Sequence, residues 1–154
     1  MTRTNITRLL LAAAVAATAA CSDSSTGPNT KNPAGTYPLI QIDKKPIPFV
    51  IYRESLVDNG GPYFEVTVEV TGGETVLADD GTFHVSIDYT IAGFGRETRQ
   101  STWLDGNYQI QGSTITLEAP DGTETGTLHD GNITLTLDVA DTEVMRQYAF
   151  KLAR

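Results

Sequence analysis

Four Asp-Gly pairs between residues 80 and 131 constrain this chain more than any other feature of its sequence. Asp-Gly is the strongest short-range signal for a β-hairpin, because a type I′ turn needs positive φ at both central positions, which glycine tolerates freely. The segments between the pairs are rich in Thr, Val, Ile, Leu and Tyr. We therefore predict an antiparallel all-β protein with turns at Asp80-Gly81, Asp105-Gly106, Asp121-Gly122 and Asp130-Gly131.

The segments between turns alternate apolar and polar residues, as strands do when one face is buried. In residues 63–71 the alternation places Phe64 and Val70 on the inward face and Glu65 and Glu69 in water. Residues 83–91 have the strongest pattern. The predicted strand segments are 37–43, 49–52, 63–71, 76–78, 83–91, 98–104, 108–111, 113–119, 123–129, 132–139 and 142–152, with a loop over 55–62 and a turn or bulge at 71–73.

About eight to ten short antiparallel strands with tight connections favour an up-and-down barrel, because closing the sheet removes its exposed edges. The alternative is a two-sheet β-sandwich, whose Greek-key topology needs some long crossing connections. We assign residues 35–154 to this domain, a length that is ample for one hydrophobic core.

Residues 1–20 indicate an export signal. Arg3 and Arg8 precede the uncharged run from Leu9 to Ala20, which is shorter than the roughly 20 residues that span a bilayer. The sequence Thr18-Ala19-Ala20-Cys21 resembles the bacterial lipobox, in which the cysteine is lipidated and becomes the new N-terminus, and Cys21 is the only cysteine of the chain. The alternative is ordinary secretion with an unmodified Cys21.

Residues 21–34 hold the lipidated Cys21 and then a segment with no large apolar residue and with prolines at 28 and 33. Such a segment has nothing to bury, so we predict a disordered tether. Ser22 after the cysteine is typical of proteobacterial lipoproteins that pass to the outer membrane. The predicted location is therefore the bacterial cell envelope, with a lipid anchor in the outer membrane and the domain facing the periplasm or the cell surface.

The chain after residue 20 is strongly acidic, with nine basic and 19 acidic residues and a formal charge of −10. Such a surface repels phosphate backbones and anionic headgroups, so nucleic acid is not an expected partner and membrane association should come from the lipid on Cys21. With no second cysteine, the domain has no internal disulfide and depends on hydrophobic packing.

These features together resemble the bacterial envelope lipoproteins that carry a lipocalin-like domain. The resemblance rests on the lipobox-like end, the opening strand Gly35-Thr36-Tyr37, the phrases at 77–83 and 106–117, and a last strand that ends the domain. It covers nearly all of residues 35–154, although lipocalins carry Trp where this chain has Tyr37 and add a helix after the barrel. It implies a β-barrel that holds a small apolar or amphipathic ligand.

The chain has few residues suited to catalysis. It has two histidines and lacks Gly-x-Ser-x-Gly, His-Glu-x-x-His, a phosphate-binding loop and an EF-hand series, so we predict no catalytic residue, no metal and no cofactor. His84 shares a strand face with Ser86 and Asp88, but residues four apart on a strand are about 13 Å apart, so we expect His84 to be a surface residue.

Arg146 is the first of four candidate ligand-binding residues. It shares strand parity with Tyr148 and Phe150, so a regular last strand would direct its guanidinium toward the core. A buried Arg needs a partner, which could be the carboxylate of a bound ligand or an internal Asp. The alternatives are a bulge or a position at the rim, where the head group reaches water.

The other candidates are aromatic. Phe94 lies between two glycines and near Arg96 and Arg99, which suggests a lid, a partner contact or an ordinary loop whose Phe folds back on the rim. Trp103 and Tyr148 are expected to face inward with Tyr108, as core residues that could also line a pocket.

Three functions remain open. The first is a ligand-binding barrel, which requires an internal cavity. The second is a structural or interaction module with a filled core that contacts another envelope component through loops around Asn59 and Phe94, which requires an exposed apolar patch. The third and least supported is an enzyme.

Overall fold

The structure is a computed structural model that describes residues 32–57, 61 and 63–153. The predicted signal (1–20), Cys21, most of the predicted tether and Asn59 lie outside the described residues. Within them, ten strands form one antiparallel sheet. The strands are β1 (Gly35–Ile42), β2 (Lys45–Pro46), β3 (Phe49–Val57), β4 (Tyr63–Leu77), β5 (Thr82–Gly93), β6 (Arg96–Gln111), β7 (Thr114–Ala119), β8 (Gly122–His129), β9 (Asn132–Leu137) and β10 (Arg146–Lys151).

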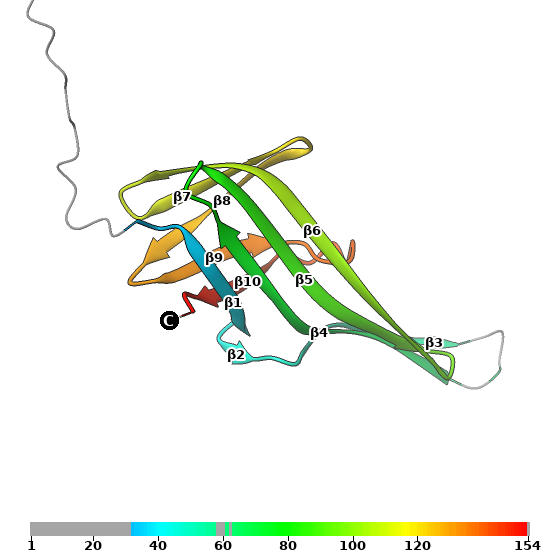
Figure 1. The fold of residues 1–154 in the computed structure, drawn as a ribbon. Coiled ribbons are helices and arrows are strands. Elements are labelled where there is room, and N and C mark those ends of the chain that lie inside the picture. The colour runs from blue at the N-terminus through cyan, green and yellow to red at the C-terminus, as the bar shows by residue number, and fades with distance from the viewer. Residues whose placement is uncertain (1–31, 58–60, 62, 154) are drawn as a thin grey trace, which may run out of the picture.

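Eight of these strands close into a barrel (Figure 1). From β4 to β10 each strand pairs with the next one in the sequence, β10 pairs with β1, and residues 35–38 of β1 pair with residues 74–77 of β4. The up-and-down barrel is therefore confirmed, and this single closed sheet excludes the two-sheet sandwich. It is compatible with the lipocalin-like barrel that the resemblance implies. β2 and β3 are additional strands on the free sides of β1 and β4.

Three of the four Asp-Gly pairs lie at hairpin turns. Asp130 and Gly131 have φ of 49° and 73°, as a type I′ turn requires, between the paired residues His129 and Asn132. The pair at 80–81 lies in the β4–β5 turn. At the β7–β8 turn the two turn residues are Pro120 and Asp121, and Gly122 is the first residue of β8, paired with Ala119.

The turn predicted at Asp105-Gly106 is wrong, because both residues lie inside the 16-residue strand β6. β5 pairs with residues 96–107 of this strand and β7 pairs with residues 107–111 on its other side, so Gly106 lies where the pairing with β7 begins. A Cβ on Gly106 would lie 2.0 Å from the carbonyl oxygen of Glu118. The glycine therefore permits a close approach of two strands and does not form a turn. The predicted strands 98–104 and 108–111 are one continuous strand.

A similar merger occurs in β4, where the predicted break at 71–73 is a β-bulge between Val70 and Gly72. The strand continues through it to Leu77. Its neighbour β3 extends to Val57, so the first three residues of the predicted loop 55–62 are strand.

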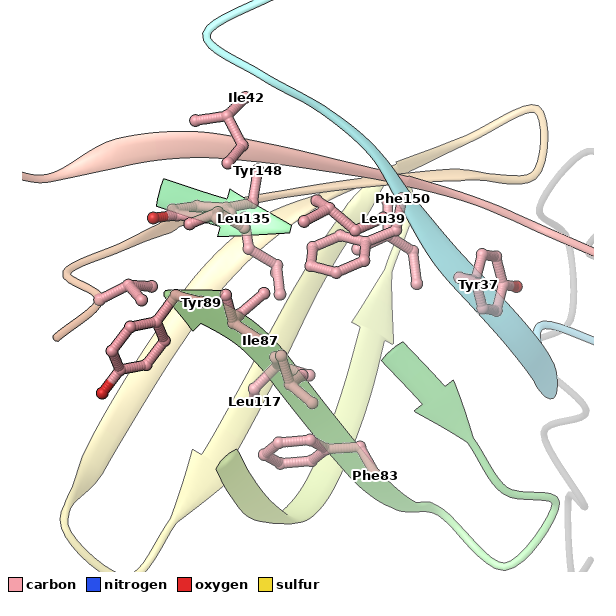
Figure 2. Packing of buried hydrophobic residues seen from close by; sticks show 14 of the residues in the cluster. Tyr37, Leu39, Ile42, Phe83, Ile87, Tyr89, Leu117, Leu135, Tyr148 and Phe150 are labelled. Atoms are coloured by element: carbon pink, nitrogen blue, oxygen red, sulfur yellow. The ribbon is translucent and has the colours of Figure 1, made fainter. Parts of the chain in front are cut away.

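The barrel interior is one hydrophobic cluster (Figure 2). Tyr37 and Phe150 are almost fully buried in it, and the hydroxyl of Tyr37 donates to the carbonyl oxygen of Pro33 at 2.5 Å. Asn32 Nδ2 donates to Asp79 Oδ1 at 2.5 Å, so residues 32–33 contact the domain although the tether was predicted to reach residue 34. The cluster also includes Leu39, Ile42, Phe83, Val85, Ile87, Ile115, Leu117, Ile133, Leu135, Val139 and Tyr148.

Beyond the barrel, β4, β5 and β6 continue and, together with β3, form a projecting sheet that we call the arm (Figure 1). We define it as residues 49–57, 63–70, 89–93 and 96–100, in which β4 lies between β3 and β5, and β6 lies at one edge. Its tip carries the β5–β6 turn, Phe94-Gly95.

Candidate functional site

Arg146 lies where the arm joins the barrel. Its Nη1 is 2.7 Å from Asp43 Oδ2, and its Nη2 and Nε donate to the carbonyl oxygen of Ile51 at 2.7 and 3.2 Å. Asp43, in the turn between β1 and β2, also accepts the backbone N–H of Gln147 through Oδ1 at 3.0 Å. The guanidinium therefore connects β10, the β1–β2 turn and β3.

The charge of Arg146 is balanced inside the protein. Burial alone would raise the pKa of Asp43, but the N–H of Gln147 and the adjacent Arg146 guanidinium hold this pKa below its ordinary value. The Arg146 side chain is 24 % exposed. The structure thus shows the internal Asp that the sequence left as one alternative for the partner of Arg146, at a half-buried position near the rim.

Tyr148 faces inward as predicted and is fully buried. Its hydroxyl and that of Thr75 have no hydrogen-bond partner among the described residues. Burial raises the pKa of Tyr148 well above its usual value. These two buried hydroxyls thus differ from that of Tyr37, which has the Pro33 carbonyl as its acceptor.

Trp103 lies outside the barrel, and the prediction that it faces inward is wrong. It pairs with Ser86 on β5, and its side chain is 67 % exposed. In a strand the inward positions alternate, and Leu104 and Tyr108 occupy them, so Trp103 must point outward. The predicted turn at 105–106 would have placed Trp103 and Tyr108 on the same face, whereas in the continuous strand β6 they have opposite parity. Tyr108 is half-buried, and its hydroxyl donates to the carbonyl of Ala78.

Phe94 lies at the tip of the arm. It has a φ of 51° and sits in a two-residue turn with Gly95. Its ring centroid is 4.9 Å from that of Phe64, yet the residue is 59 % exposed. Phe94 therefore folds back on the arm and remains available to a partner.

The four candidate ligand residues do not surround a common pocket. Two hollows on the surface of the described residues are open to solvent. One, of about 390 Å³, lies beside His84 and Asp105, and the other, of about 750 Å³, lies along the polar face of the arm near Asp88 and Glu97. Neither is lined by Arg146, Tyr148, Phe94 or Trp103.

His84 contacts a carboxylate across the strands. Its Nδ1 is 2.6 Å from Asp105 Oδ1, on the outer surface, where both side chains are well exposed. Within the described part of the chain, no group of three or more His, Cys, Asp and Glu side chains is arranged to hold a metal ion.

Sequence reasoning missed a set of apolar residues at the tip of the arm. Leu56, Val57 and Tyr63 are exposed, Tyr63 by 79 %, and they lie at the ends of β3 and β4. The alternation of 63–71 carried the signal, because Tyr63 shares parity with the solvent-facing Glu65. Phe94 contacts Phe64, the cross-strand partner of Leu56, so Leu56 and Phe94 lie on one face of the arm, whereas Val57 and its cross-strand partner Tyr63 lie on the other. These four residues expose apolar side chains on both faces at the end of the arm, and we call them the tip patch: Leu56, Val57, Tyr63 and Phe94.

Comparisons of the chain with protein-family models, with curated proteins and with solved structures found no match. None of the residues that the structure describes form a helix long and apolar enough to cross a membrane. The functional argument therefore depends on the contacts and exposures of the residues described above.

Proposed function

We propose that this chain is a lipid-anchored lipoprotein of the bacterial envelope whose filled, lipocalin-like barrel supports an arm that binds another envelope protein. The single observation that carries the proposal is the tip patch: large apolar side chains are exposed on both faces at the end of the arm, where they contribute little to the core. Exposed apolar clusters of this kind commonly mark interaction sites.

The interior of the barrel supports an interaction module over a ligand carrier. Its side chains pack against one another in one cluster, and a small eight-stranded barrel can be filled in this way. Arg146 has Asp43 and the Ile51 carbonyl as partners, so its charge does not require a ligand carboxylate.

The position of the tip also supports the proposal. Asn32, the first described residue, contacts Asp79 in the β4–β5 turn, whereas the tip lies at the β5–β6 turn. These turns are separated by the 12 residues of β5, about 40 Å of strand, and Figure 1 shows them at opposite ends of the molecule. A lipid on Cys21 would therefore attach the domain on the side of the β4–β5 turn, away from the tip, which leaves the tip accessible to a partner.

Binding of a small apolar ligand is the second candidate function. The observation that favours it is the pair of buried hydroxyls, Tyr148 and Thr75, which lack protein partners among the described residues. A ligand with a polar group could satisfy one of them.

Photo-crosslinking tests the proposed interaction. A photoreactive phenylalanine analogue replaces Tyr63 in the full chain, expressed with export into a bacterial envelope, and the matched control carries it at Ile40 on the outer face of β1. We expect one discrete protein adduct from position 63 and none from position 40. No adduct from position 63, or the same adducts from both positions, would contradict the proposal.

A further inference from the structure

Among the residues that the structure describes, one side of β6 has no neighbouring strand along most of its length. β5 pairs with residues 96–107 on one side, and β7 pairs only with residues 107–111 on the other. From residue 97 to residue 105 the outer edge of β6 is therefore unpaired among the described residues, and every residue from 96 to 101 is exposed. Natural sheets rarely leave so long an edge open.

The pairing pattern identifies the free backbone groups of this edge. Gly93 and Arg96 flank the two-residue turn Phe94-Gly95, so they form a hydrogen-bonded pair, and the bonds to β5 then fall on even-numbered residues of β6. The odd-numbered residues Glu97, Arg99 and Ser101 direct their N–H and C=O groups to the free edge. Gln111, which flanks the next turn and pairs with β7, has the same parity.

The charges along this edge are complementary to themselves. Glu97 and Arg99 lie on the same face of β6, one on each side of Thr98. If two copies pair antiparallel about Thr98, each Glu97 lies opposite the Arg99 of the other copy, and the two threonines face each other. Glu97 and Arg99 then form backbone hydrogen bonds with the other copy through their free N–H and C=O groups.

We propose that the β6 edges of two copies of this chain pair antiparallel, centred on Thr98, to join the two arms into one continuous sheet. In this register β6 of the second copy extends past the Phe94-Gly95 turn of the first copy. It does not reach β7 of the first copy, so the two barrels remain separated. The register also brings Trp103 of each copy level with the Phe94 turn of the other. Charged residues at a sheet edge prevent it from pairing with unrelated strands. Here the same charges favour one register of pairing between two copies.

Cysteine crosslinking of the full chain in membranes tests the register. Thr98→Cys places two thiols at a non-hydrogen-bonded pair, where Cα atoms are about 4.5 Å apart and a disulfide can form. Thr127→Cys, on the exposed face of β8 between two paired strands, is the matched control, and the unsubstituted chain reports any crosslink through Cys21. We expect at least tenfold more disulfide-linked dimer from Thr98→Cys than from Thr127→Cys.

Charge reversal in the Thr98→Cys background then tests the complementarity. Glu97→Arg alone and Arg99→Glu alone should each reduce the dimer at least fivefold, and the double exchange Glu97→Arg with Arg99→Glu should restore it. Circular dichroism of each variant checks that the sheet is retained. Equal dimer from Thr98→Cys and Thr127→Cys, or a double exchange that behaves like the single ones, would overturn the pairing. The proposed envelope partner binds the tip patch and not the β6 edge. A protein adduct at position 63 without a disulfide-linked dimer of Thr98→Cys would therefore overturn the β6 pairing and leave the proposed partner interaction standing.

Discussion

The barrel and the arm share the strands β4, β5 and β6 but differ in what covers the apolar faces of these strands. In β5, Phe83, Val85 and Ile87 are buried because the other barrel strands enclose them, whereas Ile91, with the same parity four residues further on, is half-buried. The alternation does not change along the strand, but the enclosure does. One sequence pattern can therefore build a core where the sheet closes and a binding surface where it continues past the closure.

The largest difference between the two regions should appear when a phenylalanine is truncated in each. Phe150 is fully buried in the barrel, whereas Phe64 is half-buried on the arm. We expect Phe150→Ala to lower the free energy of unfolding by about 4 kcal/mol and Phe64→Ala by about 1 kcal/mol, because only the first leaves an enclosed cavity. Denaturant unfolding of the two variants measures this, and equal losses would show that the arm is packed as tightly as the barrel.

A second comparison concerns Gly106, the glycine on the barrel part of β6 where the pairing with β7 begins. Gly106→Ala should cost about 3 kcal/mol, since the new methyl group would overlap the Glu118 carbonyl and force the strands apart. Gly122→Ala is the control, because no atom lies within 4 Å of a Cβ built there and its φ is not in the left-handed region. Thermal or denaturant unfolding should separate them clearly. A harmless Gly106→Ala would contradict the close approach.

The junction between the regions should depend on Arg146. Arg146→Met keeps much of the apolar stem but removes the bonds to Asp43 and the Ile51 carbonyl, and we expect a loss of about 2 kcal/mol. Asp43→Asn should cost less, since the amide can still accept the N–H of Gln147. If Arg146→Met leaves stability unchanged, the arm is not held to the barrel by this contact.

The same junction should respond to acid. Because the pKa of Asp43 is lower in the folded state, its stabilising contribution is complete above its ordinary pKa, near 4, and is lost as the pH falls through the folded-state value. Denaturant unfolding from pH 7 to about 2 should therefore show a smaller fall in stability for Asp43→Asn than for the unsubstituted chain. Parallel pH profiles would contradict this assignment.

The smallest expected effect concerns the buried hydroxyl of Tyr148. If the barrel is filled, Tyr148→Phe removes an unpartnered polar atom and should leave stability unchanged or raise it by up to about 1 kcal/mol. A loss of more than about 1 kcal/mol would show that the hydroxyl is hydrogen-bonded in solution, which would favour the ligand-binding alternative. Leu117→Met is a suitable control for a buried change without a polar atom.

Local sequence patterns predicted much of the fold. The hairpin at Asp130-Gly131 and the inward face of residues 83–91 depend on neighbouring residues alone, so they could be inferred correctly. The role of Gly106 could not, because it depends on the approach of Glu118 from another strand. The arm could not be predicted from the sequence either, because the alternation of apolar and polar residues does not show where a strand leaves the barrel.

The candidate site was predicted less well, for a related reason. Strand parity directed Arg146 toward the core side, but its partner Asp43 is 103 residues away in the sequence and only the closed sheet brings them together. The alternation also places Trp103 on the face opposite to its neighbour Leu104. Consistent use of this alternation, with Leu104 facing inward, would have placed Trp103 on the outer face of the barrel.

Mass spectrometry of the same exported, purified protein under native and denaturing conditions tests the central claim most directly. A covalent lipid on Cys21 contributes to both masses, so only a non-covalently bound molecule appears as a difference between them. A filled barrel predicts equal masses, once adducts of solvent and salt are removed. A reproducible native excess of a few hundred daltons that persists in the absence of detergent would contradict the filled barrel and identify the protein as a ligand carrier.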